Sequence, residues 1–333
     1  MRAMVLDRIA AVTESPLAWR EVPTPEPGPG EVRLRVLACG MCRTDLHVIE
    51  GDLPPRALPI IPGHQVVGVV DALGAGASRF RPGDRVGVAW LRHTCGACVY
   101  CAAGQENLCE AARFTGYHAD GGYAEQTVVP EAFAYAIPPV FDAAEATPLL
   151  CAGIIGFRSL RRSAIRPGGR LALYGFGSSA HVVIQIARHW GCEVFVSTRG
   201  AGHRALARAL GAAWVGETFD PPPVKVDSAI VFAPAGELVP VALKALRKGG
   251  TVALAGIHMS QVPALDYEEH LFYERDVRSV TANTRADGEE LLRVAAAIPL
   301  RPQVTTFPLT QANEGLQRLK RDAIDGTGVL IPG

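Results

Sequence analysis

Four cysteines lie within one short segment at a spacing that suits a metal ion. They form the pattern C-x2-C-x2-C-x7-C, made by Cys95, Cys98, Cys101 and Cys109. Glycines between them allow the tight turns that a common ligand sphere requires. Four thiolates surround one tetrahedral Zn²⁺ and leave no coordination position for water or substrate. The sequence therefore predicts a closed, structural zinc site in a lobe spanning residues 95–109.

A second segment has the pattern of a turn that binds a dinucleotide. Gly175, Gly177 and Ala180 form G-x-G-x-x-A between an apolar run, residues 170–174, and a helical pattern, residues 178–191. The first glycine permits the turn, the second lets the backbone approach a pyrophosphate, and the small alanine allows close helix packing. In this strand-turn-helix context the pattern predicts a nicotinamide cofactor site.

The next apolar run ends without an acidic residue. NAD-binding domains generally place Asp or Glu there to bind the ribose 2′-hydroxyl. This chain has Ser197, Thr198 and Arg199, with His203 and Arg204 close behind. Hydroxyls and a guanidinium suit a 2′-phosphate, so the sequence predicts NADP(H) in preference to NAD(H).

The elements that must position these groups fall into two patterns. Before residue 150, short runs of alternating apolar and polar residues, such as 31–38 and 65–74, predict a β-rich part. From about residue 153, apolar runs alternate with helical ones, which predicts a doubly wound parallel sheet. Here we expect a helix over residues 238–250 and a strand over 251–256. Beyond residue 285 we expect a helix, a strand, a second helix and a last strand.

Composition narrows the class of protein. The chain has 333 residues, 48% of them hydrophobic, with 33 Lys+Arg against 33 Asp+Glu. This is a globular profile with room for about two domains, and it lacks the basic excess that nucleic-acid binders need. It contains no apolar run of membrane-spanning length and no signal peptide pattern, so we expect a cytoplasmic protein. In that reducing compartment the eight cysteines predict metal ligands and free thiols.

Several motifs together resemble one family, the zinc-dependent medium-chain alcohol dehydrogenases. They occur in this family's order and spacing along essentially the whole chain: GMCRTDLH, PGHQVVG, RPGDRVGVAWLRHTCGACVYCAAGQENLC, GGYAEQ and LLCAG. The resemblance implies a GroES-like catalytic domain at residues 1–152 and a Rossmann cofactor domain at 153–285. It also implies a C-terminal segment, residues 286–333, that returns to the catalytic domain.

The resemblance further implies a second zinc, which is catalytic. Its ligands would be Cys42, His64 and Cys151, with a fourth position open for water or an alcohol oxygen. An open site of this kind acts as a Lewis acid and lowers the pKa of a bound alcohol. We therefore expect two zinc ions per chain.

Neighbouring residues take roles by the same resemblance. Thr44 matches the hydroxyl that bonds the alcohol, and His47 matches the histidine that passes its proton to solvent. Asp45 matches the carboxylate that orients the ligand His64. Where the family usually has Glu after that histidine, this chain has Gln65, which leaves the site more positive by about one charge.

The remaining matches concern the cofactor and the substrate. Arg43 matches a residue that contacts the pyrophosphate, and Leu53 and Trp90 match residues that line the substrate cleft. A large indole beside the zinc favours flat or small apolar alcohols and aldehydes.

The sequence thus predicts an enzyme that transfers hydride between NADP(H) and a primary or secondary, apolar or aromatic alcohol/carbonyl pair. Two alternatives stay open: a zinc-independent quinone or enone reductase of the same superfamily, and a catalytically silent NADP(H)-binding protein, which Gln65 favours. Relatives are dimers or tetramers, so we expect a homodimer or homotetramer, with no nucleic-acid or membrane partner.

Overall fold

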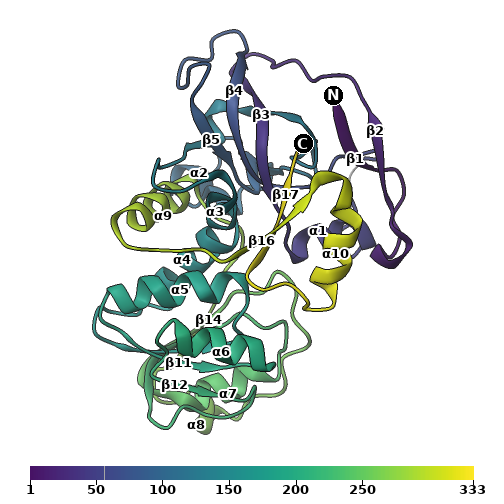
Figure 1. Cartoon of the computed structure of the whole chain (residues 1–333). Coiled ribbons are helices and arrows are strands. Elements are labelled where there is room, and N and C mark those ends of the chain that lie inside the picture. Colours follow the sequence, from purple (N-terminus) through teal and green to yellow (C-terminus); the bar gives the residue numbers. More distant parts are fainter. Residues whose placement is uncertain (56) are drawn as a thin grey trace. The chain divides into compact units, whose positions relative to one another are not determined.

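The computed structural model describes residues 1–55 and 57–333 (Figure 1). The chain divides into two compact units. Unit 1 comprises Met1–Cys151, Ala282–Ala296 and Arg301–Gly333. Unit 2 comprises Ala152–Thr281 and Ala297–Leu300.

Unit 1 is built on a seven-stranded sheet in the order β16-β17-β3-β4-β5-β9, with β8 paired to β3 as well. Two smaller pairs, β1-β2 and β6-β7, accompany it. The strands are β1 Arg2–Leu6, β2 Leu17–Glu21, β3 Glu31–Gly40, β4 Gln65–Leu73, β5 Arg85–Val88, β6 Leu91–His93, β7 Arg113–Phe114, β8 Gln126–Pro130, β9 Ala134–Ala136, β16 Val304–Pro308 and β17 Thr327–Ile331.

The long strands of this sheet follow the predicted alternation. In β3 the side chains of Val32, Leu34 and Val36 enter the core, and the residues between them are more exposed. This is the period-two pattern of a strand with one buried face. The last strand of the chain, β17, pairs antiparallel with β3, so the C-terminal segment completes the sheet of unit 1.

Short helices connect the strands of unit 1. They are α1 Arg43–Glu50, α2 Val99–Ala102, α3 Ala143–Ala146, α9 Arg285–Ala297 and α10 Ala312–Lys320, with 3-10 turns η1 Val12–Glu14, η2 Glu106–Leu108, η3 Glu131–Phe133, η4 Thr147–Leu150 and η5 Leu309–Gln311. Helix α10 is fastened to the N-terminal segment by two amide side chains. Asn313 bonds both backbone groups of Leu17, and Gln317 donates to the carbonyl of Val12.

Unit 2 is a six-stranded parallel sheet in the order β12-β11-β10-β13-β14-β15. Numbered along the chain, this order is 3-2-1-4-5-6, that of a Rossmann domain, so the predicted doubly wound fold is confirmed. The elements are β10 Arg170–Tyr174, β11 Glu193–Ser197, β12 Trp214–Gly216, β13 Val226–Val231, β14 Leu246–Leu254 and β15 Asp276–Ser279, with α4 Ala152–Arg162, α5 Ser178–His189, α6 Ala201–Ala209, α7 Leu238–Ala245 and α8 Tyr267–His270.

The expectation for residues 238–256 was wrong in one respect. Helix α7 ends at Ala245, and β14 begins at Leu246, five residues before the predicted strand. Leu246 is extended, fully buried and paired with Val226, and Gly249 adopts a left-handed backbone with φ +72. Burial of the leucine and the glycine turn together end the helix early.

Within the part of the chain that the structure describes, no helix has the length and apolarity needed to cross a membrane.

Candidate functional site

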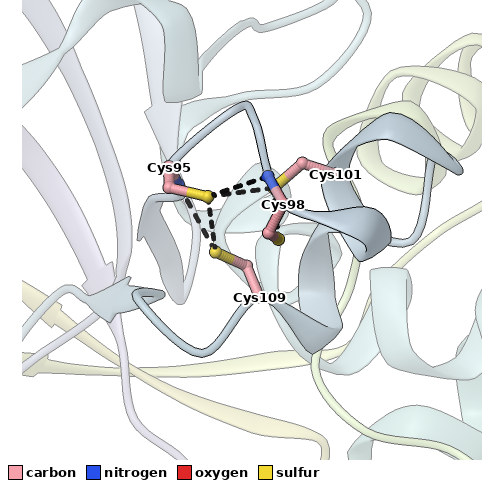
Figure 2. Close-up of side chains that lie close together, drawn as sticks. All are labelled: Cys95, Cys98, Cys101 and Cys109. Atoms are coloured by element: carbon pink, nitrogen blue, oxygen red, sulfur yellow. Dashed lines mark hydrogen bonds between the residues drawn. The ribbon is translucent and has the colours of Figure 1, made fainter.

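The four cysteines of the lobe converge on one point. Figure 2 shows their sulfur atoms turned toward one another, from the loop before α2, from α2 itself and from the end of η2. The Sγ–Sγ distances are 3.9 Å for Cys95–Cys101, 3.6 Å for Cys98–Cys101 and 3.5 Å for Cys95–Cys109. Zn–S bonds of about 2.3 Å in a tetrahedron put sulfurs about 3.8 Å apart. The arrangement fits zinc.

Two glycines and backbone hydrogen bonds prepare this lobe for a metal. Gly96 and Gly104 have left-handed backbones with φ +71 and +70, and these turns bring the cysteines together. The backbone N–H of Cys98 donates to Sγ of Cys95 over 3.3 Å. Hydrogen bonds from Ala97 and Cys98 lower the pKa of Cys95 to about 6, so one ligand is largely ionised at neutral pH before metal binds.

An ion pair that the sequence did not predict ties the lobe to α9. Glu106 in η2 is 8% exposed and receives hydrogen bonds from the backbone N–H and the guanidinium of Arg285, at 2.6–3.0 Å. The same guanidinium lies over the ring of Phe133, 4.6 Å from its centroid. Because Glu106 and Arg285 are 179 residues apart, no local pattern marks this contact.

The second metal group unites residues from three distant segments of unit 1. Cys42 is the N-cap of α1, His64 precedes β4, and Cys151 follows η4. Nε2 of His64 lies 3.4 Å from each sulfur, and the sulfurs are 4.0 Å apart. For tetrahedral zinc we expect about 3.6 Å and about 3.8 Å, from Zn–N and Zn–S bonds of about 2.0 and 2.3 Å. Three protein ligands leave a fourth position open.

Electrostatics prepare this group for a cation. The Cys151 thiol donates to Cys42 and holds the pKa of Cys42 well below its usual value, so the pair carries one thiolate. Burial works against a charged His64, yet the charges of Cys42 and Asp45 raise its pKa to about 10. Metal binding must therefore displace protons from His64 and Cys151.

Asp45 connects two of the three ligands. Its carboxylate is 2% exposed, accepts the backbone N–H of Cys42 at 2.8 Å and lies 3.3 Å from Nδ1 of His64. The first contact belongs to the capping box that begins α1. The second turns Nε2 of His64 toward the sulfurs and would keep a hydrogen on Nδ1 when Nε2 loses its own to a metal.

Gln65 lies beside this group and is fully buried. In the described residues neither atom of its amide has a hydrogen-bond partner. It lies opposite Gly40 in the β3–β4 pair, where a Cβ at position 40 would come within 3.0 Å of its Oε1. Gly40 therefore makes room for the amide, whose hydrogen-bonding capacity is unused next to His64.

Comparison with known proteins identifies a family of zinc-binding dehydrogenases, which agrees with the two groups of metal ligands. Residues 28–139 match the family model "Alcohol dehydrogenase GroES-like domain", and residues 180–297 match "Zinc-binding dehydrogenase". A probable alcohol dehydrogenase AdhA of Mycobacterium tuberculosis (strain CDC 1551 / Oshkosh) is 51% identical over 336 residues, covering 99% of this chain and 97% of that protein.

Solved structures agree as well. One described as an NAD-dependent alcohol dehydrogenase has a TM-score of 0.90 and 27% identity, with both chains covered completely. A putative zinc-binding dehydrogenase from Sinorhizobium meliloti 1021, bound to NADP, has a TM-score of 0.85 and 28% identity over 99% of each chain.

The chain belongs to the zinc-containing alcohol dehydrogenase family. It is a zinc-dependent alcohol dehydrogenase of the medium-chain dehydrogenase/reductase superfamily, and the prediction of two zinc sites is confirmed. A zinc-independent quinone or enone reductase is excluded, because both groups of zinc ligands are assembled. A catalytically silent protein is excluded because the chain belongs to a family of alcohol dehydrogenase enzymes.

Helix α1, which begins at the zinc ligand Cys42, carries the two residues predicted to move a proton. Thr44 is 9% exposed in the first turn of α1, and His47 lies in its last turn. Nδ1 of His47 is 2.9 Å from Oδ2 of Asp52, a neighbour that the sequence did not point to. Arg43, predicted to contact a pyrophosphate, is ion-paired with Asp322.

One wall beside the zinc ligands is aromatic. The indole of Trp90 meets the ring of His64 edge to face, with centroids 5.0 Å apart. It stacks on Phe114 at 4.9 Å and on Tyr117 at 5.8 Å. The sequence predicted Trp90 as a pocket residue but not Phe114 and Tyr117, on which it stacks. Leu53, the other predicted pocket residue, is half-buried just after α1.

In unit 2 the predicted cofactor turn has the shape its glycines imply. Gly175 adopts φ +90, and a Cβ there would come within 2.9 Å of the backbone N of Ala233. Gly177 is the N-cap of α5, and a Cβ there would meet nothing within 4 Å. Ala180 is fully buried. The backbone N–H groups at the start of α5 fit a pyrophosphate.

Of the three residues predicted to bind a 2′-phosphate at the end of β11, two are buried and one is exposed. Ser197 and Thr198 are 2% and 3% exposed, and the hydroxyl of Ser197 donates to the carbonyl of Asp220 at 2.9 Å. Arg199 is exposed. Arg204 reaches back to the carbonyl of Thr198 and pairs with Glu217 at 3.1 Å. Of the two arginines at this strand end, Arg199 is thus the more exposed.

Proposed function

We propose that the enzyme interconverts apolar or aromatic alcohols and their carbonyl compounds with NADP(H). The observation that carries the substrate class is the aromatic wall of Trp90, Phe114 and Tyr117, which reaches the zinc ligand His64. Flat aromatic faces bind apolar and aromatic groups.

When bound, zinc supplies Lewis-acid chemistry to the substrate oxygen, and the nicotinamide exchanges hydride with the substrate carbon. Cys42, His64 and Cys151 would hold the metal. The hydroxyl of Thr44 accepts the proton that the alcohol loses and hands its own onward, and His47 receives it nearer to solvent. The burial of Thr44 and the 21% exposure of the His47 side chain support this direction of transfer.

The two solved relatives point to different cofactors, since one is named for NAD and the other is bound to NADP. We therefore infer the preference for NADP(H) from residues of this chain. The end of β11 carries no carboxylate, and Arg199 offers an accessible guanidinium there. A guanidinium stabilises a 2′-phosphate, whereas a carboxylate would repel it. Because Ser197 is already bonded within the fold, we assign the larger share of the preference to Arg199.

The test compares initial rates for aromatic and aliphatic alcohols with NADP and NAD, on protein holding two zinc ions. We expect faster turnover with NADP and lower KM for aromatic substrates. Arg199→Ala should weaken NADPH binding by about tenfold and leave NADH binding within twofold, since it removes one charge-assisted contact. Equal loss for both cofactors would refute the cofactor proposal.

The aromatic wall has its own matched pair of variants. Trp90→Ala should raise KM for aromatic alcohols more than for short aliphatic ones. Trp19→Ala, at a tryptophan on β2 that is 38% exposed, serves as the control and should change neither. A Trp90 variant with unchanged selectivity would refute the proposed substrate class.

A further inference from the structure

Asp52 lies directly beside the histidine to which we assign the outward proton step. Its Oδ2 is 2.9 Å from Nδ1 of His47. We propose that Asp52 is a positioning residue of the proton transfer: it fixes His47 in the tautomer that carries hydrogen on Nδ1, which makes Nε2 the proton acceptor. The inference rests on the proposed role of His47.

The backbone after α1 is shaped to bring the two side chains together. Gly51 ends the helix with φ +90, a conformation in which a side chain would be strained. The N–H groups of Gly51 and Leu53 both donate to the carbonyl of His47, at 3.1 and 2.9 Å. A Cβ at position 51 would also lie 2.7 Å from Ile9. The turn therefore returns Asp52 to the side of the His47 ring.

The residue before this turn is anchored on both sides. The carboxylate of Glu50 accepts the backbone N–H of Val12 at 2.9 Å and the ammonium of Lys320 at 2.6 Å. The end of α1 is thus held by the N-terminal segment and by α10. A fixed helix end gives the His47–Asp52 contact a fixed geometry.

The chemistry of the donor set decides the tautomer. A carboxylate only accepts hydrogen bonds, so the hydrogen shared by the two groups belongs to Nδ1. A neutral imidazole protonated at Nδ1 has its lone pair on Nε2. Nε2 takes up the proton and then releases it to water, while the hydrogen on Nδ1 stays in place. His47 ends as it began.

The kinetic test uses Asp52→Ala and Asp52→Asn in the zinc-loaded enzyme. Alanine removes the acceptor, and kcat for alcohol oxidation should fall by about tenfold, with KM and the Kd of NADPH within twofold. Asparagine keeps an acceptor oxygen and should restore most of kcat. Asp7→Asn, at an exposed carboxylate paired with Arg20, is the control and should match the unaltered enzyme. Equal kcat for the alanine variant and the unaltered enzyme would overturn the inference.

A spectroscopic test does not depend on turnover. With ¹⁵N-labelled histidine, the His47 signals, assigned through His47→Gln, should report a protonated Nδ1 in the unaltered enzyme and in Asp52→Asn, and a mixture of tautomers in Asp52→Ala. The same His47 tautomer in the unaltered enzyme and in Asp52→Ala would overturn the inference. Full activity of His47→Gln would instead refute the proposed role of His47, which separates the two failures.

Discussion

Replacing Asp45 with asparagine should loosen the open zinc site and leave the four-cysteine site unchanged. The carboxylate accepts the backbone N–H of Cys42 at 2.8 Å and holds Nδ1 of His64 at 3.3 Å. An asparagine has one acceptor oxygen, so its amide nitrogen must face one of these two donors. Loss of such a support lowers metal affinity by about 10–100-fold, or about 1.4–2.7 kcal/mol.

The assay follows zinc transfer to a coloured chelator over time. Two zinc ions per chain should leave in two phases, and Asp45→Asn should accelerate only one of them. The phase from the four-cysteine site is an internal control, because none of its four ligands contacts Asp45 in the described structure. Asp71→Asn on β4, a carboxylate bonded to Arg33 and Gln126, is the matched variant. Two phases that accelerate equally, or a variant indistinguishable from Asp71→Asn, would refute the role given to Asp45.

Three further outcomes are expected. In the metal-free enzyme at pH 7, iodoacetamide should label Cys95 before Cys101, since their pKa values are about 6 and about 11; peptide mapping that finds the reverse order contradicts this. Arg285→Ala should lower the free energy of unfolding by about 1–2 kcal/mol at pH 7. Because Arg285 depresses the pKa of Glu106, this stabilisation is present above the unfolded value of 4.5 and is lost as pH falls through the lower folded value. Urea unfolding should therefore show a larger loss at pH 7 than at pH 3. Gln65→Leu should leave the stability of the metal-free enzyme unchanged or raise it by about 1 kcal/mol, because the amide it removes has no partner in the described structure; a lower melting temperature would argue against this.

The sequence predicts most strongly where chemistry is local. The four-cysteine lobe follows from spacing alone, because fifteen residues with two glycine turns can bring all four thiolates to one tetrahedral ion. The alternation of strands and helices in unit 2 could be predicted for the same reason, because the spacing of apolar residues within each segment indicates a strand or a helix. The boundary at Leu246 was misplaced because Leu246, Arg247 and Lys248 have the residue types of a last helical turn but belong to a strand.

Contacts between distant segments were beyond such reasoning. Cys42 and Cys151 are 109 residues apart, and only the resemblance to a family joined them before the structure did. Glu106 and Arg285 carry no pattern that links them, and Phe114 and Tyr117 look like any aromatic residues of a β-rich segment. At the end of β11, spacing could place Ser197 near a ribose but could not foresee that its hydroxyl is bonded to Asp220.

Helix α1 explains how the open zinc site and the proton step are kept apart. A helix favours negative charge at its N-terminus and positive charge at its C-terminus. Cys42, a zinc ligand, and Asp45, which contacts the ligand His64, lie at the first end, and His47, the proposed proton acceptor, lies in the last turn. The capping box fixes one end and the Gly51 turn fixes the other, so each function has its own local support. Changes at Asp45 should therefore appear in zinc affinity and changes at Asp52 in kcat, although both act through the same eight-residue helix.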